Sequence, residues 1–184
     1  MPINLPGSPL SLAILGLVSM QPMSGYDLRK CFATTPMGHF SASPGAVYPA
    51  LTRLEKAGWI QGIQDLRQEL RPRRMFSLTD EGKAILVGHL SRPITREDVI
   101  WRLDELLLRF SFMGHWVSGE LVKRFLSRFG LEVGGYLEVL QAQLSVFPDL
   151  PSPTARLALE FGIEQYQAAA RWASRAFAQL ESNP

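Results

Sequence analysis

The chain has 184 residues, of which 46% are hydrophobic and 20% charged, and its formal net charge is +2. These values are typical of a globular protein with one large or two small domains. No apolar run reaches the roughly 18 residues that a membrane-spanning helix needs. The first residues, MPINLPGSP, lack the basic segment and the continuous apolar stretch of an export signal. We therefore expect a cytoplasmic protein.

Cysteine and histidine give no pattern of a metal site or a disulfide. The chain has one cysteine, Cys31, and its three histidines lie far apart in the sequence. One thiol cannot form an internal disulfide, and a structural metal needs several such ligands at close spacing. We expect no metal and no cofactor, and we interpret Cys31 as a half-buried thiol on a helix.

Three helices are predicted before residue 58. Residues 9–20 (PLSLAILGLVSM) are apolar almost throughout and predict a buried first helix. A second helix is expected to begin at Ser24, because Asp27 stands three residues later in the position of a capping-box acid. The third helix is expected to begin after Ser43 and to end at Gly58, since glycine commonly follows the last helical residue. Its apolar residues recur in steps of three and four, which predicts one buried face.

A hairpin and a fourth helix are predicted next. Residues 59–64 and 75–78 are short, β-prone runs separated by the basic connection DLRQELRPRR. They predict a two-stranded hairpin with a basic tip, and Thr79 is expected to cap the helix that follows it. Helix, helix, helix, strand, strand, helix is the order of a winged helix-turn-helix domain. We assign this domain to residues 1–90.

Residues 91–184 predict helices only. Thr95 and Asp98 form a capping pair ahead of one long helix that is expected to run to Met113. In the next helix, Gly130 and the pair at 134–135 are positions where a break or a bend is expected. The predicted fold is therefore mainly α: an N-terminal winged helix-turn-helix with a two-stranded β wing, followed by an all-α C-terminal dimerisation region.

The helices after residue 118 carry apolar residues in steps of three and four. An intramolecular helical bundle shows the same spacing. However, the apolar positions spread over more than one face of each helix, which favours pairing with a second copy of the chain. The predicted dimerisation residues are Leu137, Leu140, Leu144, Ile163, Tyr166, Ala170 and Phe177.

Several segments carry a family resemblance. LSLAILGLV, PMSGYDLRK, SASPGAVYPALTRLEKAGWI and RRMFSLTDEGKA resemble the amino-terminal domain of PadR-like transcriptional regulators. DELLLRF and PTARLALEFGIEQYQAAARWASRAFAQLE resemble the C-terminal helical region of the longer PadR members, which is similar to that of virulence activators. The resemblance implies a homodimeric winged-helix repressor, which in several members responds to phenolic acids or other small aromatic effectors. Phe76 stands where members often have tyrosine, and QELRPRR lacks the glycine that is common at the wing tip.

The basic excess lies in the first half of the chain, where a DNA-binding domain is expected. Residues 1–90 have a net charge of +3, and the remainder has −1. In a helix-turn-helix the third helix enters the major groove of double-stranded DNA, and basic side chains around it bind phosphates. The predicted DNA-binding residues are Ser24, Ser43, Tyr48, Thr52, Arg53, Lys56, Arg67, Arg71, Arg73 and Arg74. A two-fold dimer is expected to read an inverted-repeat operator.

A small aromatic effector is a further hypothesis, and an enzyme and a protein–protein interaction module are the two alternatives to DNA binding. The candidate effector-binding residues are His39, Phe40, Trp101, Trp116 and Trp172, although aromatic residues at helical spacing are more often part of a core. The chain carries no glycine-rich phosphate loop, serine elbow or metal-ligand spacing, so we do not expect an enzyme. The alternative is a winged-helix protein–protein interaction module without DNA binding, which would not need the basic residues of the third helix and the wing.

Overall fold

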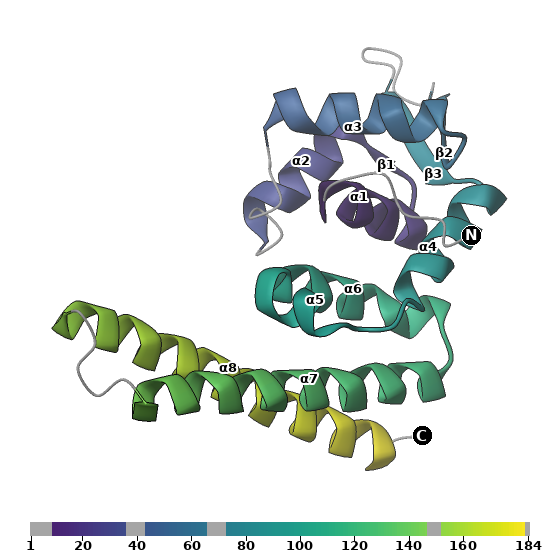
Figure 1. The fold of residues 1–184 in the computed structure, drawn as a ribbon. Helices are drawn as coiled ribbons and strands as arrows, with labels where there is room; N and C mark the ends of the chain where they lie inside the picture. The colour runs from purple at the N-terminus through teal and green to yellow at the C-terminus, as the bar shows by residue number, and fades with distance from the viewer. Residues whose placement is uncertain (1–8, 36–42, 66–72, 147–151, 183–184) are drawn as a thin grey trace. The chain divides into compact units, whose positions relative to one another are not determined.

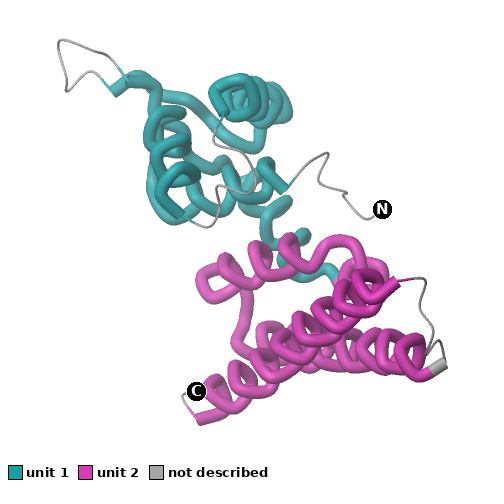
Figure 2. The backbone as a smooth tube through the Cα atoms, turned by 90° about the vertical axis from the view of Figure 1, so that its left-hand side faces the viewer, with its two compact units in different colours: residues 1–92 teal, residues 93–184 magenta. Residues whose placement is uncertain are grey.

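The computed structural model describes residues 9–35, 43–65, 73–146 and 152–182. The chain forms two compact units, residues 1–92 and residues 93–184 (Figures 1 and 2). The first unit contains α1 (Pro9–Met20), β1 (Met23–Ser24), α2 (Gly25–Thr34), α3 (Pro44–Lys56), β2 (Ile60–Asp65), β3 (Arg73–Leu78) and α4 (Asp80–Leu90). The second contains α5 (Arg96–Trp101), α6 (Leu103–Trp116), α7 (Gly119–Val146) and α8 (Pro153–Ser182).

The core of the first unit is built around α1. Residues Leu10 to Val18 are buried on every side of this helix, and α3, α4 and β3 all pack against it. Ile14 and Leu15 are fully buried, as are Leu28 of α2 and Leu86 of α4. The prediction of a buried first helix is confirmed, and burial on all sides explains why its sequence lacks the polar face of a surface helix.

Three strands form a small antiparallel sheet in which β3 is central. The predicted two-stranded wing is present, with β2 and β3 paired in register from Ile60 opposite Leu78 to Asp65 opposite Arg73. A third strand that we did not predict, β1, pairs with the other edge of β3. It has only two residues, too few to show the alternating pattern by which strands are recognised in a sequence.

The predicted helix boundaries of the first unit are confirmed by specific hydrogen bonds. The Ser24 and Asp27 capping box opens α2 as expected, with both reciprocal bonds formed. At the end of α3, Gly58 has a φ of +76°, and the amides of Gly58 and Trp59 donate to the carbonyls of Glu55 and Leu54. This pair of bonds is the Schellman motif, in which glycine adopts the left-handed conformation at least cost.

The prediction of one continuous helix from residue 95 to Met113 is wrong, because this segment divides into α5 and α6 at Arg102. The capping box of Thr95 and Asp98 forms, but Arg102 has a φ of −141° and a ψ of 35°. Its guanidinium lies 2.8 Å from the Asp98 carboxylate, which is 1% exposed. No glycine or proline marks this break in the sequence.

At the glycines of the next helix a break or a bend is expected, and the break is wrong. Helix α7 runs for 28 residues through all three of them, and it packs lengthwise against the 30-residue α8 (Figure 1). A Cβ added at Gly130 would lie 3.9 Å from the Cβ of Ala173, and one added at Gly135 would meet the Arg96 guanidinium. Gly135 therefore leaves room for the Arg96 side chain, whereas a Cβ at Gly130 would make only an ordinary van der Waals contact. Neither glycine interrupts the helix.

An aromatic cluster joins three helices of the second unit. The rings of Phe125 and Phe129 of α7 are stacked with centroids 6.2 Å apart. Trp172 of α8 meets the Phe129 ring edge-on at 5.5 Å, and Phe110 of α6 lies 5.2 Å from Trp172. Such pairs add to the stabilisation from burial, so this cluster is the centre of the second core.

Candidate nucleic-acid interface

The outer face of α3 carries every residue that we predicted on it. Val47, Ala50, Leu51 and Leu54 are buried against the rest of the unit, which directs the opposite side of the helix to solvent. The predicted residues on that side, all exposed, are Ser43 at the N-cap, Tyr48, Thr52, Arg53 and Lys56. The two basic residues lie in the last turn of the helix.

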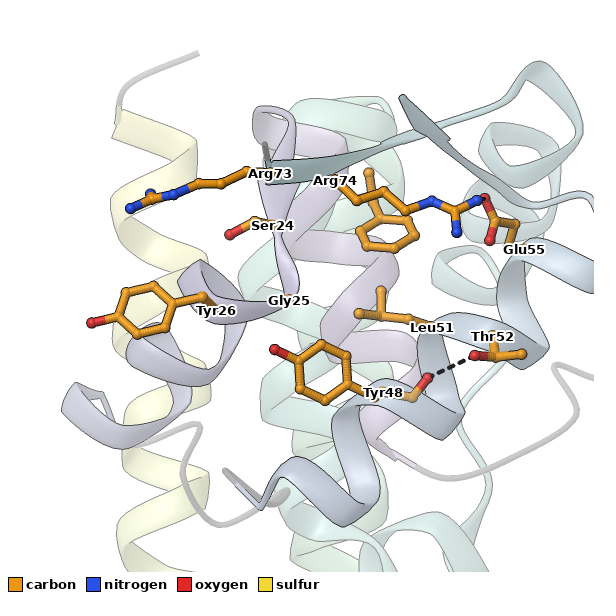
Figure 3. A pocket seen from close by; sticks show the side chains of 10 residues that line it. Ser24, Gly25, Tyr26, Tyr48, Leu51, Thr52, Glu55, Arg73 and Arg74 are labelled. Atoms are coloured by element: carbon orange, nitrogen blue, oxygen red, sulfur yellow. Dashed lines mark hydrogen bonds and ion pairs between the residues drawn. The ribbon is translucent and has the colours of Figure 1, made fainter. Parts of the chain in front are cut away.

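A groove of about 640 Å³ lies beside this face (Figure 3). Its lining comes from four elements: the end of β1, the start of α2, helix α3 and strand β3 of the wing. The lining residues are Ser24, Gly25, Tyr26, Tyr48, Leu51, Thr52, Glu55, Arg73, Arg74 and Phe76. Five of the ten predicted DNA-binding residues therefore meet at one place, and Arg53 and Lys56 lie on the same helix beside them.

The two wing arginines within the described ranges have different neighbours. The guanidinium of Arg73 lies 5.9 Å from the centre of the exposed Tyr26 ring. Arg74 instead reaches across to α3, where its Nη2 lies 2.7 Å from Oε1 of Glu55, and its guanidinium lies 5.6 Å from the centre of the Phe76 ring. In Figure 3 the Arg74 side chain points along the groove towards Glu55.

Gly25 permits the close approach of α2 and α3 at the groove. A Cβ added to this residue would stand 2.6 Å from Cε1 of Tyr48 and 3.3 Å from Cδ1 of Leu51. Only glycine therefore leaves the Tyr48 ring where it now lies, against the first turn of α2 (Figure 3).

Two of the predicted contact residues have hydroxyl groups that donate within the protein. Ser24 Oγ donates to Asp27 Oδ2 at 2.6 Å and accepts from the Asp27 amide, and the residue is 4% exposed. Thr52 Oγ1 donates to the Tyr48 carbonyl at 3.1 Å. A hydroxyl that has donated its proton retains only acceptor capacity, so Thr52 is suited to accept from a base and Ser24 serves mainly as a helix cap.

Four of the predicted residues lie outside the described ranges. They are Arg67 and Arg71 of the wing tip and the effector candidates His39 and Phe40. The three remaining effector candidates have different surroundings. Trp172 belongs to the aromatic cluster, Trp116 is half-buried at the end of α6, and Trp101 is 79% exposed.

The predicted dimerisation residues all lie on α7 and α8, where the two helices already cover part of them. Leu140 and Ile163 are buried within the unit, and the other five are half-buried. The Tyr166 hydroxyl donates to the Val99 carbonyl at 3.0 Å. Burial raises the pKa of this phenol above its ordinary value because the phenolate is disfavoured away from water, and neighbouring Tyr136 adds to the rise.

Among the lining residues of the groove that were not predicted as DNA-binding residues are Glu55 and Tyr26. Glu55 follows Tyr48 and Thr52 at the spacing of one helix face, a signal that could have identified it. Tyr26 carries no such signal. The apolar side chains that α7 and α8 leave open to solvent are Leu131, Val139, Leu157 and Phe161, with exposed fractions of 64%, 42%, 62% and 62%.

Within residues 9–35, 43–65, 73–146 and 152–182, no three His, Cys, Asp or Glu side chains gather in a way that could hold a metal ion. Among the same residues, no helix combines the length and the apolarity of a membrane-spanning segment.

Comparison with known proteins relates the first unit to one family. Residues 14–87 match the model of the transcriptional regulator PadR-like family. The negative transcriptional regulator PadR of Bacillus subtilis (strain 168) is 31% identical over 104 residues, which are 56% of this chain and 56% of that protein. The transcriptional regulator YqjI of Escherichia coli (strain K12) is 32% identical over 73 residues, 40% of this chain and 33% of that protein. The matches thus span about half and a third of these relatives.

Solved structures of PadR from Bacillus subtilis resemble the whole chain more loosely. The crystal structure in complex with operator DNA is 26% identical and aligns with 94% of this chain and 99% of its own, with a TM-score of 0.44. The crystal structure in complex with p-coumaric acid is 26% identical and aligns with 97% and 98%, with a TM-score of 0.41.

Proposed function

Because this chain belongs to the PadR-like family of transcriptional regulators, we propose that it is a homodimeric repressor that binds double-stranded DNA at a specific sequence. One observation carries the proposal. The outer face of α3, the start of α2 and the arginines of β3 meet at a single groove. A recognition helix needs such an arrangement, with base-reading residues on the helix and cationic side chains beside it.

The exposed residues at this surface are expected to make two kinds of contact, with base edges and with phosphates. Arg53 offers two parallel N–H donors that match the acceptors of guanine in the major groove. Thr52 directly precedes Arg53 on the same helix and Tyr48 lies five residues before it, and both line the groove. Lys56 of α3 and Arg73 of β3 are exposed cations, suited to bind the phosphates that hold the helix in register.

We place DNA binding in residues 1–90, and dimerisation together with effector binding in residues 91–184. The four exposed apolar side chains of α7 and α8 support a second copy as their partner, because long exposed apolar surfaces are uncommon on monomers. A small aromatic effector that binds the second domain would release the DNA. Phenolic acids are the first compounds to test, since p-coumaric acid is bound in a structure of the Bacillus subtilis relative. A protein that binds DNA works in the compartment that holds it, so we place this one in the cytoplasm.

Selection of bound fragments from the genomic DNA of the source organism tests this function. The wild-type chain should enrich a small set of fragments that share an inverted repeat, with the promoter of its own gene as the first candidate. The matched control is the double variant Arg53→Ala, Arg73→Ala, which keeps the buried face of α3 and should enrich none of them. Equal recovery of all fragments by the wild-type chain would contradict sequence-specific binding.

Salt and half-site geometry give a quantitative prediction. If the dimer makes about 6 to 10 phosphate contacts, operator affinity should fall by about 10³- to 10⁵-fold between 50 and 200 mM salt. The half-sites should lie about 10 or 20 bp apart, one or two helical turns. A fluorescence anisotropy titration at several salt concentrations measures the first effect. If the protein bound an isolated half-site as tightly as the full repeat, binding as a two-fold symmetric dimer would be excluded.

The proline inside α3 gives a second prediction. Pro49 is exposed in the second turn of the helix, and the amide that it lacks would have paired with the carbonyl of Gly45. Pro49→Ala restores that bond at the fraying end of the helix and shifts Ser43 and Tyr48 relative to Arg53. We expect a severalfold change in operator affinity or sequence preference with an unchanged dimer, measured by titration and sedimentation. Identical binding profiles would make the proline incidental to recognition.

A further inference from the structure

Glu55 holds three elements of the first unit together. It lies on α3, where its side chain is 29% exposed, and it lines the groove next to Thr52. Its Oε1 accepts from the backbone amide of Gly62 in β2 at 2.9 Å and from Nη2 of Arg74 in β3 at 2.7 Å. One carboxylate oxygen thus bridges the recognition helix and both strands of the wing.

The sheet is shaped to admit this bridge. Gly62 stands directly opposite Phe76 in the register of β2 and β3. A Cβ added at Gly62 would meet Arg74 Nε, would come within 2.9 Å of Glu55 Oε1, and would lie 3.0 Å from the Phe76 ring. Any larger residue at this position would therefore displace the bridge, and the Arg74 guanidinium also packs beside the Phe76 ring.

A carboxylate on a DNA-binding face lowers the affinity for DNA, because it repels phosphates and neutralises a cation that would attract them. Glu55 is placed where both effects operate, since Arg74 is one of the two described wing arginines at the groove. The carboxylate must therefore contribute something other than attraction to DNA. The bonds to Gly62 and Arg74 identify that contribution as the fixed position of the wing relative to α3.

We propose that Glu55 is a positioning residue for DNA recognition, which locks the wing to the recognition helix through Gly62 and Arg74 and favours sequence specificity over total affinity. This inference rests on the proposed DNA-binding function. Arg74 lines the groove, and its bond to Glu55 uses one of the five N–H donors of a guanidinium while it restricts the orientation of the group. A guanidinium held in place discriminates between acceptor patterns better than a mobile one, because it cannot reorient towards a mismatched pattern without breaking its bond to Glu55.

Glu55→Gln is the test. Glutamine keeps the size of the side chain and can still accept from the Gly62 amide, but it removes the negative charge that holds Arg74. The affinity for a shuffled duplex should rise by up to about fivefold, the range of an exposed ion pair, while operator affinity stays constant or falls. The ratio of the two affinities should therefore drop, with little change in melting temperature. The probes are an operator fragment recovered by the genomic selection and a shuffled duplex of equal length and composition.

Two controls separate the bridge from a general charge effect. Glu81→Gln removes the same charge from an exposed position of α4, outside the groove, and should leave the affinity ratio unchanged. In an Arg74→Gln background, Glu55→Gln should lower the ratio no further. Equal losses of specificity for Glu55→Gln and Glu81→Gln, or independent effects of Glu55→Gln and Arg74→Gln, would overturn the proposal.

The same titrations distinguish this inference from the function on which it rests. A wild-type chain that binds operator and shuffled DNA equally well would refute the proposed function itself. A wild-type chain that prefers the operator, with a ratio that Glu55→Gln leaves unchanged, would refute only the role of Glu55.

Discussion

Phe129→Ala is expected to lower the free energy of unfolding of the second unit by about 3 to 5 kcal/mol, the range for a large aromatic residue removed from a core. Phe129 is fully buried and contacts the rings of both Phe125 and Trp172. Its removal takes away the ring that joins α7 to α8 in the cluster and leaves a cavity. Urea unfolding followed by circular dichroism and tryptophan fluorescence measures the change.

Ser127→Ala is the matched control for this experiment. Ser127 lies two residues earlier on α7 and is exposed, so its replacement should change the free energy of unfolding by less than about 0.5 kcal/mol. Both variants must be compared with the wild-type chain at one protein concentration, because the stability of any protein that self-associates depends on concentration. A Phe129→Ala protein as stable as the control would mean that the aromatic cluster does not hold the second core together.

Gly82→Ala is expected to destabilise the first unit by about 2 to 3 kcal/mol, the upper part of the range for an overpacked core. A Cβ at this position would overlap the carbonyl oxygen of Trp59, which is a backbone atom and cannot rotate away. That carbonyl also accepts from the Thr79 amide at 3.1 Å, and the Thr79 side chain caps α4 by accepting from the Gly82 amide. The substitution therefore pushes the first turn of α4 away from the strand it packs against.

Gly88→Ala on the same helix is the control and should have the opposite sign. A Cβ added at Gly88 meets nothing within 4 Å, and alanine stabilises an exposed helical position by about 0.5 to 1 kcal/mol relative to glycine. Thermal melts of the two variants should thus move in opposite directions from the wild-type midpoint. A Gly82→Ala protein that melts at or above the Gly88→Ala midpoint would show that α4 can shift at no cost.

Features that depend on neighbouring residues in the chain were predictable. The capping boxes at Ser24 and Thr95 and the glycine at the end of α3 each need only a side chain and backbone groups within one turn. The buried face of α3 follows from its 3.6-residue period, and the opposite face then had to carry Tyr48, Thr52 and Arg53. The family resemblance rested on the same segments, so the class of the first domain was accessible from the sequence.

Features that depend on partners distant in the sequence were not predictable. The sequence does not indicate that Arg74 pairs with a residue 19 positions earlier, since each of the two reads as an ordinary surface charge. The glycines of α7 have the pattern of a helix break, and only the proximity of Arg96 shows that Gly135 has a packing role. The break at Arg102 has no local signal at all.

The sequence by itself determined the helices and the β2–β3 hairpin of the first unit, the helix caps and the face of α3 that is exposed, because backbone propensity and apolar periodicity act within one or two turns. Only the tertiary structure decided which exposed charges are joined and which apolar residues of α7 and α8 remain open to solvent. Long-range contacts decide these properties, since the same arginine or leucine is compatible with either outcome until its neighbours from other elements are in place.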